Sequence, residues 1–146
     1  MKRKLNYLFP MLLLLATAGC IKNSNDPSNI IIPVGNFAGQ FTRIHLSRAT
    51  GKLDTIKANI TLNMAVATGY AVGGDTTHHA ASYGGYVVDG QNIAFSDLTL
   101  PANSTSTAPP AKTHLNGVYQ YTYTGTSMQI SASNDTLGVL YVLALK

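Results

Sequence analysis

Apolar and polar residues alternate with a period of two over most of the chain after residue 36. Leu53 to Met64 is the clearest case, because every second residue from Ile56 onward is apolar and the residues between are Lys, Asn and Thr. This alternation predicts a half-buried β-strand. The shorter stretches Phe37–Arg48, Val66–Val72, Tyr83–Val88 and Gln91–Leu98 predict further strands, and no stretch indicates a helix.

The first predicted strand contains a change of phase. Phe37, Gly39 and Phe41 share one face, whereas Ile44 and Leu46 fall on the other. A bulge or strong bend near Thr42-Arg43 would return both sets to one core, so we expect one there.

Turn residues organise the rest of the chain into hairpins. Asp89-Gly90 is a strong hairpin signal, and as a two-residue turn it pairs Tyr86 with Ile93. Gly125-Thr126 and Asn134-Asp135 predict a three-stranded C-terminal meander. Both turns place one set of residues on a single interior wall: Tyr119, Tyr121, Tyr123, Met128, Ile130, Leu137, Val139 and Tyr141. The other side of the last strand is also apolar, at Leu140, Val142 and Ala144, so we expect that strand either to be covered on both faces or to be central in its sheet.

About eight strands with short sequential turns predict an antiparallel up-and-down eight-stranded barrel, and an immunoglobulin-like sandwich is the alternative. Two polar stretches, Asp75–Ala81 and Pro101–Thr113, predict mobile surface loops. Ile30–Ile32 predicts either a short strand or a plug against one end of the domain.

The sequence also resembles small lipocalin-like (calycin-like) domains in its strand order and size. The resemblance rests on Gly39-x-Phe41 near the start and on the alternation of Tyr141, Leu143 and Leu145 at the end. It implies a barrel that binds a small apolar ligand. The residues that would line such a cavity are Tyr86, Phe95, Tyr119, Tyr121, Tyr123 and Tyr141. The same residues could instead form a filled core.

The first twenty residues have the pattern of an export signal. Lys2, Arg3 and Lys4 precede an apolar run from Leu5 to Ala18, and small residues lead to Cys20, the chain's one cysteine. Thr17-Ala18-Gly19-Cys20 resembles the lipobox of bacterial lipoproteins, which implies lipidation of Cys20.

We therefore expect a signal peptide over residues 1–19, a lipidated tether over 20–34 and one barrel domain over 35–146. Ile21 stands where an Asp would retain some lipoproteins at the inner membrane, so we expect the outer membrane.

Composition limits the possible partners. The chain carries ten Lys or Arg and six acidic residues, and loss of residues 1–19 would leave seven against six. The basic residues are scattered, so we expect no nucleic-acid partner.

The candidate chemistry is sparse. His78 and His79, with Asp75 nearby, form a weak candidate metal site. His45 and His114 are isolated, and Ser96-Asp97 lacks the surroundings of a catalytic nucleophile. We expect no catalytic residue and no cofactor.

These features predict a non-enzymatic lipoprotein of the cell envelope, attached to the membrane by its lipid. Its barrel would bind a small apolar ligand or act as an interaction module. The alternative is a structural or accessory subunit of a surface protein complex.

Overall fold

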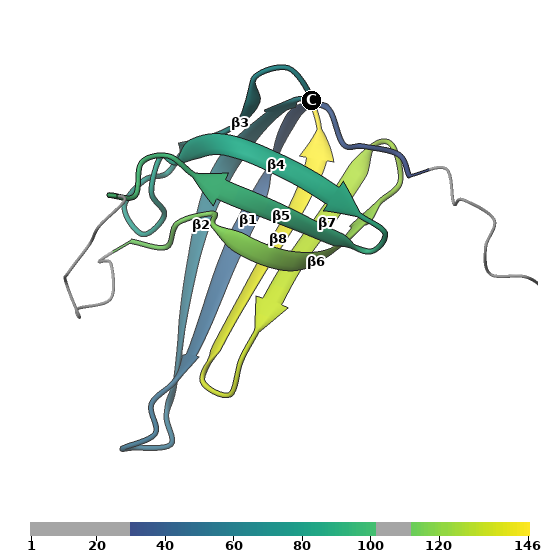
Figure 1. The fold of residues 1–146 in the computed structure, drawn as a ribbon. Helices are drawn as coiled ribbons and strands as arrows, with labels where there is room; N and C mark the ends of the chain where they lie inside the picture. Colours follow the sequence, from purple (N-terminus) through teal and green to yellow (C-terminus); the bar gives the residue numbers. More distant parts are fainter. Residues whose placement is uncertain (1–29, 102–111) are drawn as a thin grey trace, which may run out of the picture.

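The computed structural model describes residues 30–101 and 112–146, which form eight antiparallel strands closed into one barrel (Figure 1). Each strand pairs with its neighbours in sequence, and the last strand pairs with the first. The strands are β1 (Gly35–Leu46), β2 (Leu53–Ala65), β3 (Gly69–Gly74), β4 (Tyr83–Asp89), β5 (Asn92–Asp97), β6 (Gly117–Tyr123), β7 (Ser127–Ser133) and β8 (Leu137–Leu145). The predicted up-and-down barrel is confirmed, and the alternative of a sandwich is wrong.

Alternation of side chains fills the inside of the barrel. Phe37 and Phe41 on β1, Leu62 on β2 and Tyr141 on β8 are completely buried. Their neighbours along each strand point outward, as strand geometry requires. The predicted wall of the C-terminal meander is confirmed for seven of its eight residues, because Tyr119, Met128, Ile130 and Tyr141 are buried and Tyr121, Tyr123 and Val139 pack against them. The eighth, Leu137, is partly exposed and is not part of this core.

The hairpin registers show why the predicted faces were correct even where the turns were not. The β6–β7 turn is as predicted, with Tyr123 opposite Met128. In β4–β5 and β7–β8, however, each register differs from the prediction by two residues: Tyr86 lies opposite Phe95, and Ile130 opposite Tyr141. A shift of two residues keeps every side chain on its face, whereas a shift of one would reverse them all.

The β7–β8 turn shows what determines the observed register. The backbone N–H of Asn134 donates to the carbonyl oxygen of Leu137, at 2.8 Å, and closes this turn. The side-chain oxygen of Asn134 also accepts the N–H groups of Thr136 and Leu137, at 3.0 and 2.8 Å. Asn134 therefore precedes the turn and does not form its first central residue.

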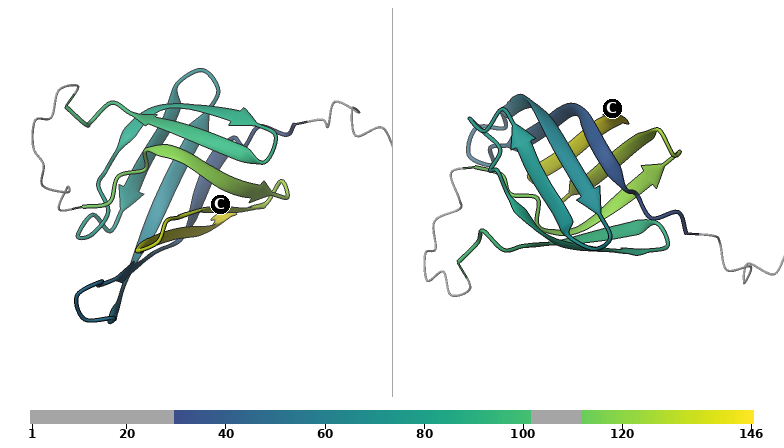
Figure 2. Two further views of the ribbon diagram at one scale, coloured as in Figure 1. Left: turned by 60° about the horizontal axis from the view of Figure 1, so that its bottom comes forward. Right: turned by 90° about the horizontal axis from the view of Figure 1, so that it is seen from above.

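The predicted bulge in the first strand is absent. The β1–β2 ladder runs without interruption from Gly35–Met64 to Leu46–Leu53, and β1–β8 is equally continuous. Ile44 lies on the outer face and is 43% exposed. The phase change has another cause: β1 and β2 continue past the barrel wall as a projecting hairpin, where neither face of the sheet is fully covered (Figure 2).

Two other strand predictions need correction. The third strand begins at Gly69, and Val66 lies in the preceding turn, 71% exposed. The outer side of β8 is not covered by the described residues, since Val142 is 53% exposed. The predicted loop after Pro101 falls largely outside the described residues.

The barrel has two different ends. The N-terminal end, where β1 starts, includes the β2–β3, β4–β5 and β6–β7 turns and the C-terminus. Pro33 is buried at this end, and the Tyr86 hydroxyl donates to its carbonyl at 2.8 Å. The opposite end includes the β1–β2 and β7–β8 turns and the loop from β3 to β4.

The face assignment makes a testable prediction. Ile130 is fully buried, whereas its neighbour Gln129 points outward. Ile130→Ala should lower the free energy of unfolding by about 2–5 kcal/mol through lost burial and a residual cavity. Gln129→Ala is the control and should change it by less than about 0.5 kcal/mol. Urea unfolding measures both, and equal losses in the two variants would contradict the assignment.

Candidate functional site

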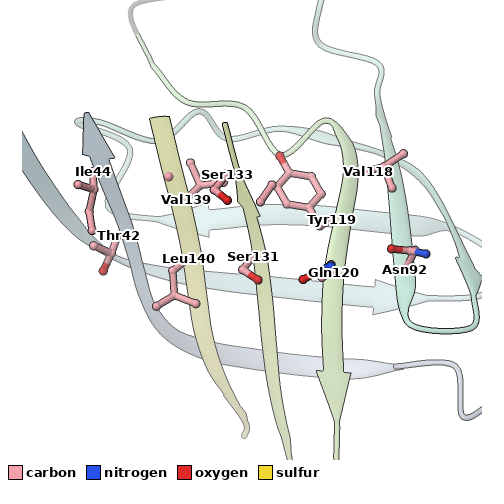
Figure 3. Close-up of a pocket in the computed structure, with 12 residues that line it drawn as sticks. Thr42, Ile44, Asn92, Val118, Tyr119, Gln120, Ser131, Ser133, Val139 and Leu140 are labelled. Carbon is pink, nitrogen blue, oxygen red and sulfur yellow. The ribbon is translucent and has the colours of Figure 1, made fainter. Parts of the chain in front are cut away.

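A groove opens in the barrel wall between β6 and β7. The two strands pair only from Gln120–Ser131 to Tyr123–Met128, and toward the opposite end they separate. Figure 3 shows Tyr119 on one side of this separation and Ser131 and Ser133 on the other. The groove has a volume of about 500 Å³ and continues over the outer faces of β8 and β1, where Leu140, Thr42 and Ile44 contribute.

The lining of this groove is uncharged. Its polar members are hydroxyl and amide side chains, and its apolar members are mainly aliphatic: Thr42, Asn92, Gln120, Ser131 and Ser133, with Ile44, Val118, Ala132, Val139 and Leu140. Val118 is 67% exposed. A surface of this kind suits a neutral partner that offers both hydrogen bonds and apolar contact.

A second groove adjoins the first and contains His114. It has a volume of about 380 Å³ and shares Val118, Tyr119 and Val139 with its neighbour. The Nδ1 atom of His114 lies 2.7 Å from the Oδ2 atom of Asp97, whose side chain is completely buried. No local sequence pattern indicates this pair, because seventeen positions separate its members and residues 102–111 lie between them.

Asp97 is held by several donors. Its Oδ1 atom accepts the backbone N–H and the hydroxyl of Thr99, at 2.7 and 2.6 Å. Burial opposes ionisation of Asp97, but the hydrogen bonds from Thr99 and His114 outweigh burial and hold the pKa of Asp97 below its ordinary value. Nδ1 of His114 therefore donates to a carboxylate. The pair fixes the chain before β6 to the end of β5.

The hydroxyl beside this pair is that of Thr99, which donates to Asp97 and lies 3.5 Å from Nδ1 of His114. Ser96 is exposed on the outer face of β5 and makes no hydrogen bond with a histidine. In a catalytic triad the nucleophile lies at the histidine nitrogen that does not contact the aspartate. Here the Thr99 hydroxyl and the Asp97 carboxylate both lie at Nδ1 of His114.

The predicted surface loop Asp75–Ala81 is exposed from Asp75 to His78, but His79 departs from the prediction. Its side chain is completely buried, packed edge-on against the rings of Phe41 and Tyr141 at 4.8 and 5.6 Å between ring centres. The backbone around it is also held, because Ala80 N–H donates to Thr113 O at 2.8 Å. His79 thus closes the opposite end of the barrel from inside. Sequence reasoning missed this because alternation does not show that a polar residue finds buried partners.

The hydrogen bonds define the form of His79. Its Nδ1 atom lies 2.8 Å from the carbonyl oxygen of Ala80, so Nδ1 carries the proton. In the neutral ring Nε2 then accepts from the Tyr141 hydroxyl at 2.9 Å. Burial lowers the pKa of His79 and raises that of Tyr141, which favours this neutral pairing.

The structure separates the two histidines of the candidate metal site. His78 is exposed, whereas His79 points into the core. Within residues 30–101 and 112–146, no three His, Cys, Asp or Glu side chains gather in a group that could hold a metal ion. His45 lies exposed on the projecting part of β1.

The six aromatic residues of the predicted cavity all face the interior. Phe95, Tyr119 and Tyr141 are buried, and Tyr86, Tyr121 and Tyr123 pack against the core. Rings contact rings across the barrel, for example Phe95 with Tyr119 and Tyr119 with Tyr141, at 5.9 and 6.2 Å between centres. Tyrosine hydroxyls near the ends of the barrel donate to backbone carbonyls, as Tyr119 does to Asn116 at 3.0 Å. These residues therefore fill the space that they enclose.

Comparison of the chain with protein-family models, with curated proteins and with solved structures gave no match. Nor do the described residues contain a helix long and apolar enough to span a membrane. Cys20, the predicted lipidation site, lies outside the described residues.

Buried His79 predicts a pH dependence of stability. A histidine titrates near pH 6.5 in an unfolded chain, but burial lowers the pKa of His79 in the fold. The unfolded state therefore binds the extra proton first. Above about pH 6.5 His79 is neutral in both states and does not lower the free energy of unfolding. Below that pH, protonation of the unfolded state lowers the free energy of unfolding, by at most about 1.4 kcal/mol per pH unit.

His79→Gln should flatten the dependence of the unfolding free energy between about pH 6.5 and 5. The control His78→Gln, at an exposed neighbour, should leave the slope unchanged. Urea unfolding at several pH values measures the slope, and an NMR titration of His79 in the wild-type chain measures its pKa directly. A His79 pKa at or above 6.5 would contradict the prediction.

Proposed function

We propose that this protein is a lipid-anchored component of the bacterial cell envelope and that its barrel is a rigid, non-enzymatic interaction module. The observation that supports this best is the filled interior. Aromatic and aliphatic side chains occupy the barrel, with Pro33 buried at one end and His79 at the other. An interior occupied by buried side chains favours recognition through the outside of the barrel over carriage of a ligand within it.

Two features of the outer surface support recognition there. The groove between β6 and β7 offers uncharged hydrogen-bonding and aliphatic side chains. In addition, β2 pairs with β3 only from Ile60 onward, so the part of β2 before Ile60 has a strand partner on one side only. Grooves and free strand edges are common docking sites for partner proteins. Service as a structural or accessory subunit of a surface complex is a specific form of this proposal.

The lipid anchor rests on the sequence. A positive start, an apolar run and small residues precede the chain's one cysteine. A free thiol in an exported protein is reactive, and acylation of Cys20 would remove it. Two or more acyl chains give stable attachment, whereas one chain binds only marginally.

Cys20→Ala tests the anchor. We expect this change to move the protein from the membrane fraction to the soluble fraction, or to block processing, because the acylated side chain is lost. Ser28→Ala, eight positions further along, is the control and should leave attachment unchanged. Cell fractionation and the mass of the N-terminal peptide measure the result, and full membrane attachment of Cys20→Ala would refute the anchor.

Photo-cross-linking tests the interaction module. Val118 in the groove and Val87 on β4 are both 67% exposed, but only Val118 lines the groove. A photo-reactive residue at position 118 should give a discrete cross-linked envelope protein in whole cells, because a docked partner covers the groove. The same residue at position 87 should give none. The absence of any product at 118, or the same product at both positions, would refute docking in the groove.

A further inference from the structure

The N-terminal end of the barrel carries a cluster of exposed apolar side chains. Ile30, Ile31, Ile32 and Val34 are 44%, 62%, 46% and 46% exposed. Val66, in the β2–β3 turn of the same end, is 71% exposed. We call Ile30, Ile31, Ile32 and Val34, which lie within five consecutive residues, the apolar rim; Val66 belongs to a different turn of the same end. Exposed clusters of this kind mark surfaces that contact an apolar partner.

Tyrosines lie next to the rim. Ile30 and Ile31 line a groove of about 440 Å³ together with Gly90, Tyr121 and Tyr123. The two tyrosine rings are half-buried, and the Tyr123 hydroxyl donates to the carbonyl of Gly125 at 3.0 Å. Tyrosine has an apolar body and a polar tip, so it is common at the boundary between hydrocarbon and water.

Charge is concentrated at the other end. Of the charged side chains in the described ranges, only two lie at the N-terminal end of the barrel. They are Asp89, at the end of β4, and Lys146, which follows β8. The projecting hairpins and loops of the opposite end carry Arg43, Arg48, Lys52, Asp54, Asp75, Lys112 and Asp135. The exposed aliphatic side chains of residues 30–34 therefore lie at the end of the barrel with fewer charged side chains.

The position of the chain's start relates this asymmetry to a membrane. Ile30 is the first described residue, and Cys20 stands ten positions before it. A chain of that length spans at most about 35 Å even when fully extended. If Cys20 is acylated, the apolar rim is the part of the described structure that follows the anchor most closely along the chain. The anchor then keeps the rim at a high effective concentration relative to the bilayer surface.

The geometry points to the apolar rim as a membrane-docking surface, on which the barrel rests upright against the lipid with its charged end directed away. This inference rests on the proposed lipid anchor. The occupant of the rim is the interfacial region of a bilayer, into which apolar side chains enter by about 5–10 Å. The few charges near the rim include both signs, so contact requires no anionic lipid.

Single tryptophans test the docking, because the chain has none of its own. Ile31→Trp places the reporter in the rim. Leu53→Trp, at a residue 68% exposed on the projecting β1–β2 hairpin, is the matched control at the other end. Each full-length variant is produced in a bacterium that lipidates exported proteins and is reconstituted into neutral phosphatidylcholine vesicles with or without bromine-labelled acyl chains.

We expect bromine to reduce the fluorescence of Ile31→Trp about twofold, because a docked rim reaches the acyl chains, and to leave that of Leu53→Trp unchanged. Flotation of the same vesicles reports the anchor separately. Flotation without quenching at position 31, or with equal quenching at both positions, would overturn the docking and leave the anchor intact. Shielding of position 31 that depends on protein concentration and not on bromine would assign the rim to a second copy and overturn the docking. Failure to float, with unmodified Cys20, would overturn the anchor and the docking together.

Discussion

The pairing of β8 with β1 is the contact on which the rest of the structure depends. It joins the two ends of the described barrel over nine residue pairs, from Phe37–Leu145 to His45–Leu137. Without it, β1 and β8 would be two open edges, and the inner face would be exposed to water between them. Closure gives every strand an inner and an outer face, so successive side chains along a strand point alternately into the core and toward solvent. We call this alternation the parity rule. Because β1 and β8 lie far apart in the sequence, bringing them together costs loop-closure entropy. The apolar burial in the closed barrel must offset that cost.

The parity rule explains how much of the fold could be predicted. Alternation in Leu53–Met64 and in the C-terminal meander identified the inner residues correctly. Turn residues gave registers that were right, or wrong by two, and Tyr86 kept its interior face although its partner is Phe95 and not Ile93. The bulge predicted at Thr42-Arg43 failed because it assumed that every apolar side chain in a strand must reach the core. Where β1 leaves the barrel wall, Ile44 remains partly exposed.

The grooves and polar pairs could not be predicted because they depend on contacts between distant segments. His79 is adjacent to an exposed histidine and lies in a loop of polar residues, so its burial follows only from the position of Tyr141, sixty-two residues later. His114 likewise acquires a partner only when the end of β5 is brought beside the segment before β6. The groove exists because β6 is not paired with β7 before Gln120, and no local sequence signal marks the end of a ladder.

Stability explains why the interior is filled. The chain's one cysteine lies in the N-terminal segment, so the barrel holds no disulfide and must be stabilised by burial. At about 24 cal/mol per Å³, an empty cavity of a few hundred Å³ would cost roughly 5–10 kcal/mol. That is comparable with the entire stability of a typical domain, about 5–15 kcal/mol. Rings such as Phe41, Phe95 and Tyr141 occupy this volume, and His79 closes it with both ring nitrogens hydrogen-bonded. In a barrel filled in this way, the surfaces open to contact are its outer wall and its two ends, where the uncharged groove and the apolar rim are found.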